Sequence, residues 1–362
     1  MRLPRRSLGL DRFSGIYLWA LFVLVFGLWE PGTFLTKATL DSISSEQAVG
    51  AMLGIVVVLP LAAGVYDLSI GATANLSAIA ATWLQDSHHW AVWPATAAAV
   101  GCGVVIGATN GFLVVKLKVN AFIATLGMAT VVAAVQEIIS VSQPLPPTSQ
   151  AWAHLSGLEI GGIQIVVVYM LVLAAILWWV LEHTPAGRYL RAIGANAESA
   201  RLAGVNVGGW QWLAFVVAAA VAGIAGVLYA SQNGPSTTFG TALLLPAYAA
   251  AFLGSTQLRP GRFNIWGTVL AVYVLATGVD GLELATGVAW LNDMFNGVAL
   301  IVAVAFAVWR QGKTGRVESA PSADSNSDSD VRDRLRQRSV RTMLTLSRRY
   351  MYSGQQRKPT TE

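Results

Sequence analysis

Residues 182–208, EHTPAGRYLRAIGANAESARLAGVNVG, form the longest charged interruption in an otherwise apolar chain. The runs on either side, 163–181 and 210–230, are long enough to cross a bilayer and contain no charged residue. A polar segment held between two spans is available to a soluble partner. Basic residues are also expected in any loop that fixes the orientation of a membrane protein, so both interpretations stay open at this point.

The local chemistry of this interruption predicts one short helix. Asn196 is suited to cap its N-terminus, and Glu198 falls in the first turn, where the helix dipole favours a carboxylate. Gly204 is suited to end the helix, because glycine readily adopts the left-handed conformation in which many helices stop. We therefore expect a helix of about two turns over 197–203. Its small apolar face is expected to consist of Ala200, Leu202 and Ala203.

The composition identifies the chain as a multi-pass membrane protein. Of its 362 residues, 54% are hydrophobic and only 12% are charged, about half the charged fraction of a soluble domain. With a span length of about 20 residues, the apolar runs predict an all-α fold of about ten transmembrane helices. The predicted spans are 16–29, two within 47–84, 91–115, 121–139, 163–181, 210–230, 242–254, 264–280 and 289–309.

Two of these runs are irregular. The run 47–84 is too long for one helix and fits two, with a break near 63–71 that contains Asp67, its only charged residue. The run 242–254 is short and contains Pro246, so the eighth helix is expected either to begin earlier, near Phe239, or to be broken. The first run, in contrast, ends without a small-residue cleavage site, which predicts an uncleaved span instead of a signal peptide.

The distribution of Lys and Arg supports this number of spans. Starting from a cytoplasmic N-terminus, ten crossings leave Lys37 as the only basic residue in the outer loops and place the C-terminus in the cytoplasm. Without the eighth crossing, Arg259, Arg262 and the Arg-rich tail would lie outside. The basic residues expected in inner loops are Lys116, Lys118, Arg188, Arg191, Arg201, Arg259 and Arg262.

The character of the chain changes near residue 310. We expect a permease domain over 1–310, which contains the 182–208 segment, and a cytoplasmic, low-complexity, basic tail over 311–362. The polar composition of 317–330 is typical of disorder. Beyond it, arginines alternate with apolar residues, so the tail either lies on anionic lipid as an amphipathic helix or is solvated. Nucleic-acid binding is not expected, because the tail is tethered to a membrane.

The sequence offers no chemistry of its own. It contains no Ser/His/Asp grouping, metal-ligand cluster or Gly-rich cofactor motif, so we expect neither an enzyme nor a cofactor. Its single cysteine, Cys102, excludes an intrachain disulfide. Residues 307–314 satisfy a relaxed phosphate-binding pattern that ends in Gly-Lys-Thr, but they follow a span where a working phosphate loop follows a strand.

Polar side chains within spans are costly and mark candidate contacts for a transported solute. Asp67 leads these candidates, and its alternative role is to cap a helix break by accepting hydrogen bonds from amides near Ser69 and Gly71. Asn292 and Asn296 are one helical turn apart and therefore share a face near the outer mouth. The candidates are Asp67, Asn75, Asn110, Asp280, Asn292 and Asn296.

Several motifs, in order along the chain, resemble those of permease subunits of ATP-binding-cassette (ABC) importers. Glu198-Ser199-Ala200-x-x-x-Gly204 is similar to their EAA-x-x-x-G loop, in which a short cytoplasmic helix docks on the ATPase subunit. Four further segments resemble motifs of the ribose/xylose-type (monosaccharide) branch, which is related to the branched-chain amino acid permeases: 66–71, 110–113, 122–127 and 261–268. The chain departs from that branch at 243–246 and 279–281, which leaves the solute unnamed.

The resemblance implies a permease subunit of the bacterial plasma (inner) membrane that imports a monosaccharide or similar small polar solute. It also implies an ATPase subunit, a second permease copy or a paralogue, and an extracytoplasmic solute-binding protein as partners, all in or beside membrane lipid. The implied ATPase-coupling residues are Gly194, Asn196, Glu198, Ala200, Arg201 and Gly204. The alternative is an ion-gradient-driven secondary transporter, which paired acids in mid-membrane would favour; only Asp67 is expected there.

Overall fold

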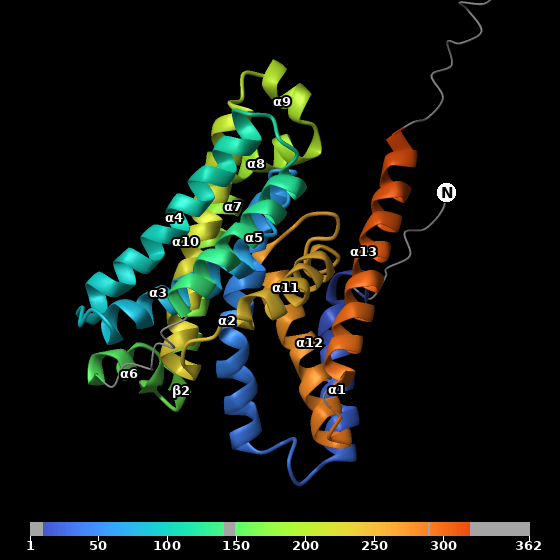
Figure 1. Ribbon diagram of the computed structural model, residues 1–362. Helices are drawn as coiled ribbons and strands as arrows, with labels where there is room; N and C mark the ends of the chain where they lie inside the picture. Colours follow the sequence, from blue (N-terminus) through green and yellow to red (C-terminus); the bar gives the residue numbers. More distant parts are fainter. Residues whose placement is uncertain (1–9, 141–148, 289, 319–362) are drawn as a thin grey trace, which may run out of the picture. The chain divides into compact units, whose positions relative to one another are not determined.

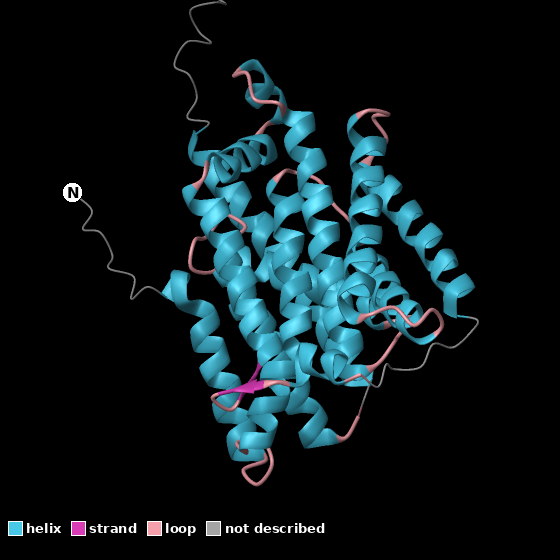
Figure 2. Ribbon diagram, turned by 90° about the vertical axis from the view of Figure 1, so that its left-hand side faces the viewer, coloured by secondary structure: helices cyan, strands magenta, loops and turns pink. Residues whose placement is uncertain are grey.

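The computed structural model describes residues 10–140, 149–288 and 290–318, and these residues are almost entirely helical (Figure 2). The chain divides into two units, 1–309 and 310–362. In the second unit the described residues are only the end of one helix. The polar and basic tail expected beyond it, with its possible lipid contact, lies outside the described residues.

Ten helices of the described residues match the ten predicted spans in order (Figure 1). They are α1 (Leu10–Trp29), α2 (Lys37–Ala62), α3 (Ile70–Asp86), α4 (Val92–Val115), α5 (Ala121–Ser140), α7 (Ile165–His183), α10 (Val207–Asn233), α11 (Phe239–Ser255), α12 (Ile265–Thr286) and α13 (Trp290–Glu318). Six of them are long and apolar enough to cross a membrane: α2, α4, α5, α7, α10 and α12. Shorter apolar helices occur within α1, α11 and α13. An all-α, multi-pass architecture is thus confirmed, whereas ten crossings remain a prediction.

The remaining elements are small. Helix α6 (Gln150–Gly157) precedes a two-residue hairpin of β1 (Glu159–Ile160) and β2 (Ile163–Gln164), in which Glu159 pairs with Gln164. Helices α8 (Pro185–Ala195) and α9 (Ala197–Leu202) fill the segment between α7 and α10. The hairpin and the α8–α9 segment lie at opposite ends of the first unit (Figure 1).

The first unit contains two similar groups of three helices that run in opposite directions. In each group a long helix of 26 or 27 residues precedes a 17-residue helix and then a helix of 24 or 22 residues: α2–α3–α4 and α10–α11–α12. The long helices pack against each other, and each packs on the two later helices of the other group. Helix α2 is the most buried of the six spans, with 83% of its apolar window inside, against 22% for α5.

The two short helices follow non-helical segments, 63–69 and 234–238, and their N-termini meet inside the unit. A side chain on Gly71 of α3 would overlap the Gly240 carbonyl of α11, and a side chain on Gly240 would overlap the Gly71 carbonyl. Only glycine permits this approach of two backbones. Helix α11 begins at Phe239, as one of the two expectations for the eighth span had it, and runs through Pro246 without interruption.

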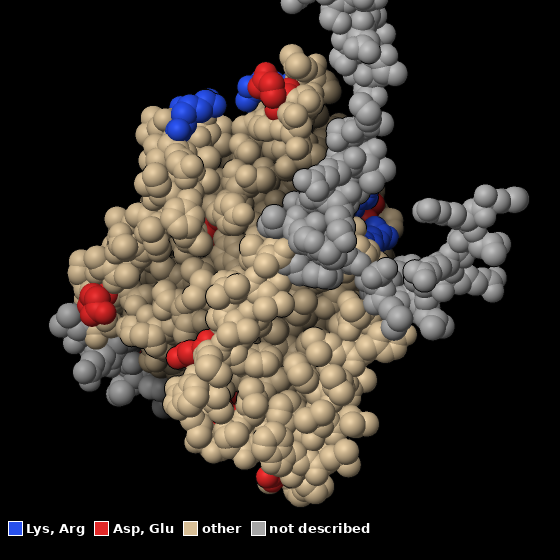
Figure 3. All heavy atoms as spheres, turned by 90° about the vertical axis from the view of Figure 1, so that its right-hand side faces the viewer, with Lys and Arg blue, Asp and Glu red and all other residues tan. Residues whose placement is uncertain are grey.

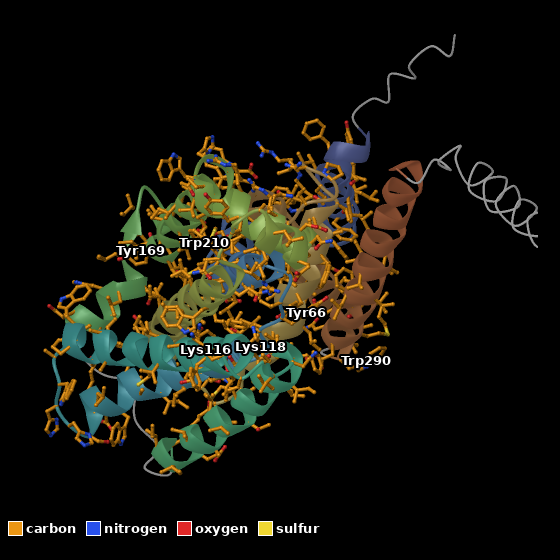
Figure 4. All side chains as sticks on the ribbon, turned by 90° about the horizontal axis from the view of Figure 1, so that it is seen from above. Tyr66, Lys116, Lys118, Tyr169, Trp210 and Trp290 are labelled. Atoms are coloured by element: carbon orange, nitrogen blue, oxygen red, sulfur yellow. The ribbon has the colours of Figure 1, made fainter. Side chains whose placement is uncertain are left out.

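Basic side chains gather at the end of the unit that carries α8 and α9. In the face shown in Figure 3, Lys and Arg atoms lie toward this end, while acidic atoms are also found in the opposite half. Lys116 and Lys118 lie beside each other in the α4–α5 loop there (Figure 4). Lys37 begins α2 at the opposite end, near the hairpin glycine Gly162. The prediction that the α8–α9 end faces the cytoplasm depends on this separation of basic residues between the two ends.

Candidate coupling segment and solute pathway

The segment 182–208 folds into two helices, of which the first was not predicted. Thr184 and Pro185 start α8 in the manner typical of helices, with proline in the first turn, where its missing amide is not needed. Leu190 and Ile193 are buried, whereas the rest of the helix is largely exposed. Helix α8 is therefore an amphipathic helix that packs its apolar side on the unit.

Helix α9 has the boundaries that the sequence predicts, to within one residue at its C-terminus. The Asn196 side chain accepts a hydrogen bond from the Ser199 amide at 2.9 Å, which satisfies one of the free amides of the first turn. Gly204 has φ +84°, in the left-handed region, and its amide donates to the Arg201 carbonyl. The Val205 amide donates to the Ala200 carbonyl at 3.0 Å, completing the glycine-dependent helix stop.

The predicted apolar face of α9 is wrong. Ala200 is buried and packs with Ile193 and Val207 in a small apolar cluster that fixes α9 to α8 and α10. Leu202 points the other way and is 83% exposed, the largest exposure among the described large hydrophobic residues. Two residues apart on a helix, Ala200 and Leu202 cannot share a face. Glu198 and Arg201 form an exposed ion pair at 2.7 Å beside Leu202.

A second ion cluster joins α8 to the loop that follows α11. Glu182, at the end of α7, is largely buried and pairs with both Arg191 of α8 and Arg259 of the 256–264 loop. One carboxylate thus ties three segments of the basic end together. The sequence placed these three residues on one side of the membrane but did not indicate that they are in contact.

Asp67 caps the break between α2 and α3 (Figure 4 labels its neighbour Tyr66). It is fully buried, and its Oδ1 accepts from the Ser69 amide at 3.0 Å and from the Ser69 hydroxyl at 2.6 Å. Asn110 of α4 donates to that hydroxyl at 2.8 Å. The Tyr248 hydroxyl of α11 makes two hydrogen bonds to the Asp67 backbone. It accepts one from the Asp67 amide and donates one to the Asp67 carbonyl, both at 3.0 Å.

Asn75 of α3 also has a capping role, in this case at the start of α11. Its Oδ1 accepts from the Gly240 amide at 2.7 Å, and its Nδ2 donates to the Thr237 carbonyl at 2.7 Å. Gln136 of α5 donates to the same carbonyl at 2.8 Å. Asn75 therefore caps a neighbouring helix across the unit, a role that the sequence does not reveal because the two helices are distant in the chain.

The other three solute candidates come together at the end opposite α9. Asp280, Asn292 and Asn296 line one pocket of about 290 Å³, formed by the middle of α2, the part of α11 around Pro246, the second half of α12 and the first turns of α13. Asn292 donates to Glu283 at 2.7 Å, and its Oδ1 has no partner among the described residues. Polar pocket residues that the sequence analysis missed are Gln47, Glu283 and Asp293. An adjoining pocket of about 420 Å³ adds Glu46.

The described residues can also be checked for a metal site and for a phosphate-binding loop. Among them, no group of three or more His, Cys, Asp or Glu side chains is placed to hold a metal ion. Residues 307–314, which carry the relaxed phosphate-binding pattern, are helical within α13. A phosphate loop needs free backbone amides, which a continuous helix does not offer.

The chain is a membrane permease, and comparison with known proteins shows its family. A family model described as "Branched-chain amino acid transport system / permease component" matches residues 41–304. The chain therefore belongs to this family of transport permeases and is the membrane subunit of an ATP-driven importer. This result confirms the resemblance seen in the sequence and decides against the ion-gradient-driven alternative.

Curated relatives match over most of their length. The ribose import permease protein of Escherichia coli strain K12 is 31% identical over 277 residues, 75% of this chain and 86% of the relative. The D-allose transport system permease protein of the same strain is 27% identical over 299 residues, 82% and 91% of the two chains. The autoinducer 2 import system permease protein of Salmonella typhimurium strain LT2 is 30% identical over 293 residues, 79% and 84%.

Proposed function

We propose that this permease imports a monosaccharide or a similar small polar solute across the bacterial inner membrane. The observation that carries the solute class is the pocket of about 290 Å³ at the outer end, where amide and carboxylate groups converge. Its volume lies near the lower limit of ligand pockets, roughly 300–1,000 Å³. Hydroxyl groups of a sugar pair well with such acceptors and donors, and the relatives include permeases for ribose and D-allose.

We further propose that α9 is the docking element for the ATPase subunit. It is rigidly bounded by Asn196 and Gly204, and it presents Leu202 together with the Glu198–Arg201 pair to the surroundings. An exposed apolar side chain beside a charged pair matches the apolar centre and polar rim of a protein–protein interface. A second permease copy or a paralogue would complete the pathway, and an extracytoplasmic binding protein would deliver the solute.

Alanine at Asn292 or Asn296 should reduce monosaccharide uptake by about ten-fold, because a site built to hydrogen-bond a hydroxyl loses much of its affinity when one partner is removed. Uptake of radiolabelled ribose and D-allose into proteoliposomes that hold the complete importer measures this effect. Asn233→Ala, an exposed asparagine outside the pocket, is the matched control. Uptake of leucine but of no monosaccharide would overturn the proposed solute class.

The proposed orientation places α9 in the cytoplasm and the end of α3 outside. Single cysteines at Asp86 and Ser199, introduced with Cys102→Ala, should therefore label oppositely with an impermeant maleimide: the first on intact cells, the second only after the membrane is opened. The substitution of Cys102 is needed because this cysteine is exposed. Equal labelling at both positions on intact cells would contradict the orientation.

A further inference from the structure

At Gly194, the backbone of helix α8 closely approaches the backbone of the break before α3. A side chain on Gly194, next to the last residue of α8, would overlap the Ala62 carbonyl and lie 3.3 Å from the Gly64 amide nitrogen. Conversely, a side chain on Gly64, whose φ is +74°, would lie 3.2 Å from the Gly194 Cα. Gly194, one of the residues that the resemblance implies for ATPase coupling, is therefore seated against the end of α2.

This contact is closely connected to α9. Asn196 is the only residue between α8 and α9, and Ile193 packs on Ala200 of α9 in the same apolar cluster. Gln211, in the first turns of α10, donates a hydrogen bond to the Ala63 carbonyl at 3.3 Å. Helix α9 is therefore linked to residues 62–64 through direct contacts of α8 and α10.

Residues 65–69 are hydrogen-bonded to three other helices. Tyr248 of α11 binds the Asp67 backbone at both its amide and its carbonyl. Thr125 of α5 accepts a hydrogen bond from the Leu68 amide at 3.1 Å. Asn110 of α4 reaches the Ser69 hydroxyl. The break 63–69 is thus a short backbone segment that touches α8 at one end and α4, α5 and α11 along its length.

We propose that Gly194 is a positioning residue for energy coupling, and that its backbone contact with residues 62–64 carries the movement of α9 into the transmembrane helices. The inference rests on the proposed docking of the ATPase at α9. Glycine is needed at 194 because any side chain would separate the two backbones and leave α9 able to dock but unable to move the break.

The test uses the complete importer in nanodiscs with Gly194→Ala. The cognate ATPase subunit should still co-purify, while stimulation of ATP hydrolysis by the solute-loaded binding protein falls about ten-fold, the size of a typical allosteric coupling. Gly101→Ala in α4 is the matched control, because a methyl group there meets open space, and it should behave as wild type. If Gly194→Ala responds to the loaded binding protein as wild type does, the proposal is wrong.

A second readout distinguishes coupling from a merely structural effect. Tyr66, in the break, is 44% exposed, and seen from above it lies toward the middle of the unit, in contrast to Trp290 at the edge (Figure 4). With Tyr66→Cys and Cys102→Ala, the rate of maleimide labelling should change several-fold when ATP is added. Gly194→Ala should remove this change while the ATPase remains bound; persistence of the change would overturn the inference.

Gln211→Leu supplies the same test if Gly194→Ala lowers the yield of folded protein. It removes the hydrogen bond to Ala63 without steric overlap and should reduce stimulation by a smaller factor, about three-fold. Unchanged stimulation in Gln211→Leu, when Gly194→Ala does not fold, would count against the proposal. Failure of the ATPase to co-purify with the wild-type chain would instead refute the proposed docking at α9, so the two failures are distinguishable.

Discussion

Replacing Gly204 with valine should abolish the coupling between solute and ATP hydrolysis while leaving the permease inserted. At φ +84° a β-branched residue costs about 1–2 kcal/mol or more, so the stop after Leu202 will open and α9 will lose its orientation. No atom lies within 4 Å of the missing side chain, so the effect is one of backbone conformation and not of overlap. Stimulated ATPase activity and co-purification of the ATPase, both in nanodiscs, measure it.

Gly204→Asn is the matched control, because asparagine tolerates the left-handed conformation better than any other residue with a side chain. It should keep most of the coupling. Glu198→Lys should give a milder defect of the same kind, since it breaks the pair with Arg201 and sets a cation against the helix N-terminus. Wild-type behaviour of both Gly204→Val and Glu198→Lys would reduce the segment to a topology signal.

Leucine at Asp67 should eliminate transport, whereas asparagine should retain a large part of it. Leucine cannot accept the two hydrogen bonds from Ser69, and each buried donor left unpaired costs about 1–3 kcal/mol. The Ser69 hydroxyl also accepts a hydrogen bond from Asn110 of α4, so a displaced Ser69 would weaken the contact with α4 as well. An asparagine side chain keeps an oxygen acceptor where Asp67 Oδ1 lies, and the cap can form again.

Uptake at matched amounts of inserted protein, judged by size-exclusion chromatography, separates capping from a need for charge. If Asp67→Asn is as inactive as Asp67→Leu, the negative charge itself is required, and the capping role is insufficient. The geometry favours the cap, because both hydrogen bonds of Oδ1 come from Ser69, the N-cap residue of α3.

Much of the fold was predictable because apolar runs and glycine stops act locally. The ten predicted spans correspond to ten helices, and the break at 63–69 lies where a single charge, Asp67, interrupts the run 47–84. Helix α9 was predicted to within one residue, since Asn196 and Gly204 determine its ends through bonds to their immediate neighbours.

Elements that depend on distant contacts or on short signals were missed. The sequence signal for α8 was present in Thr184-Pro185, and that for the hairpin in Gly161-Gly162, whose φ values of +63° and +83° suit a two-residue turn. By contrast, nothing local indicates that Asn75 caps α11 or that Glu182 joins two arginines. These roles depend on packing between segments that are distant in the chain. The Asn75–Gly240 and Glu182–Arg259 contacts each join residues more than 70 positions apart.

The meeting of α3 and α11 at Gly71 and Gly240 has an electrical consequence. Both helices present N-terminal ends there, and each such end carries roughly half a positive elementary charge. Asp67 offsets the end of α3, whereas the end of α11 is capped by the uncharged Ser236 and Asn75. A carboxylate at Asp67 carries one negative elementary charge, which equals the sum of the two half-charges, so the two helix ends and this side chain together are close to neutral.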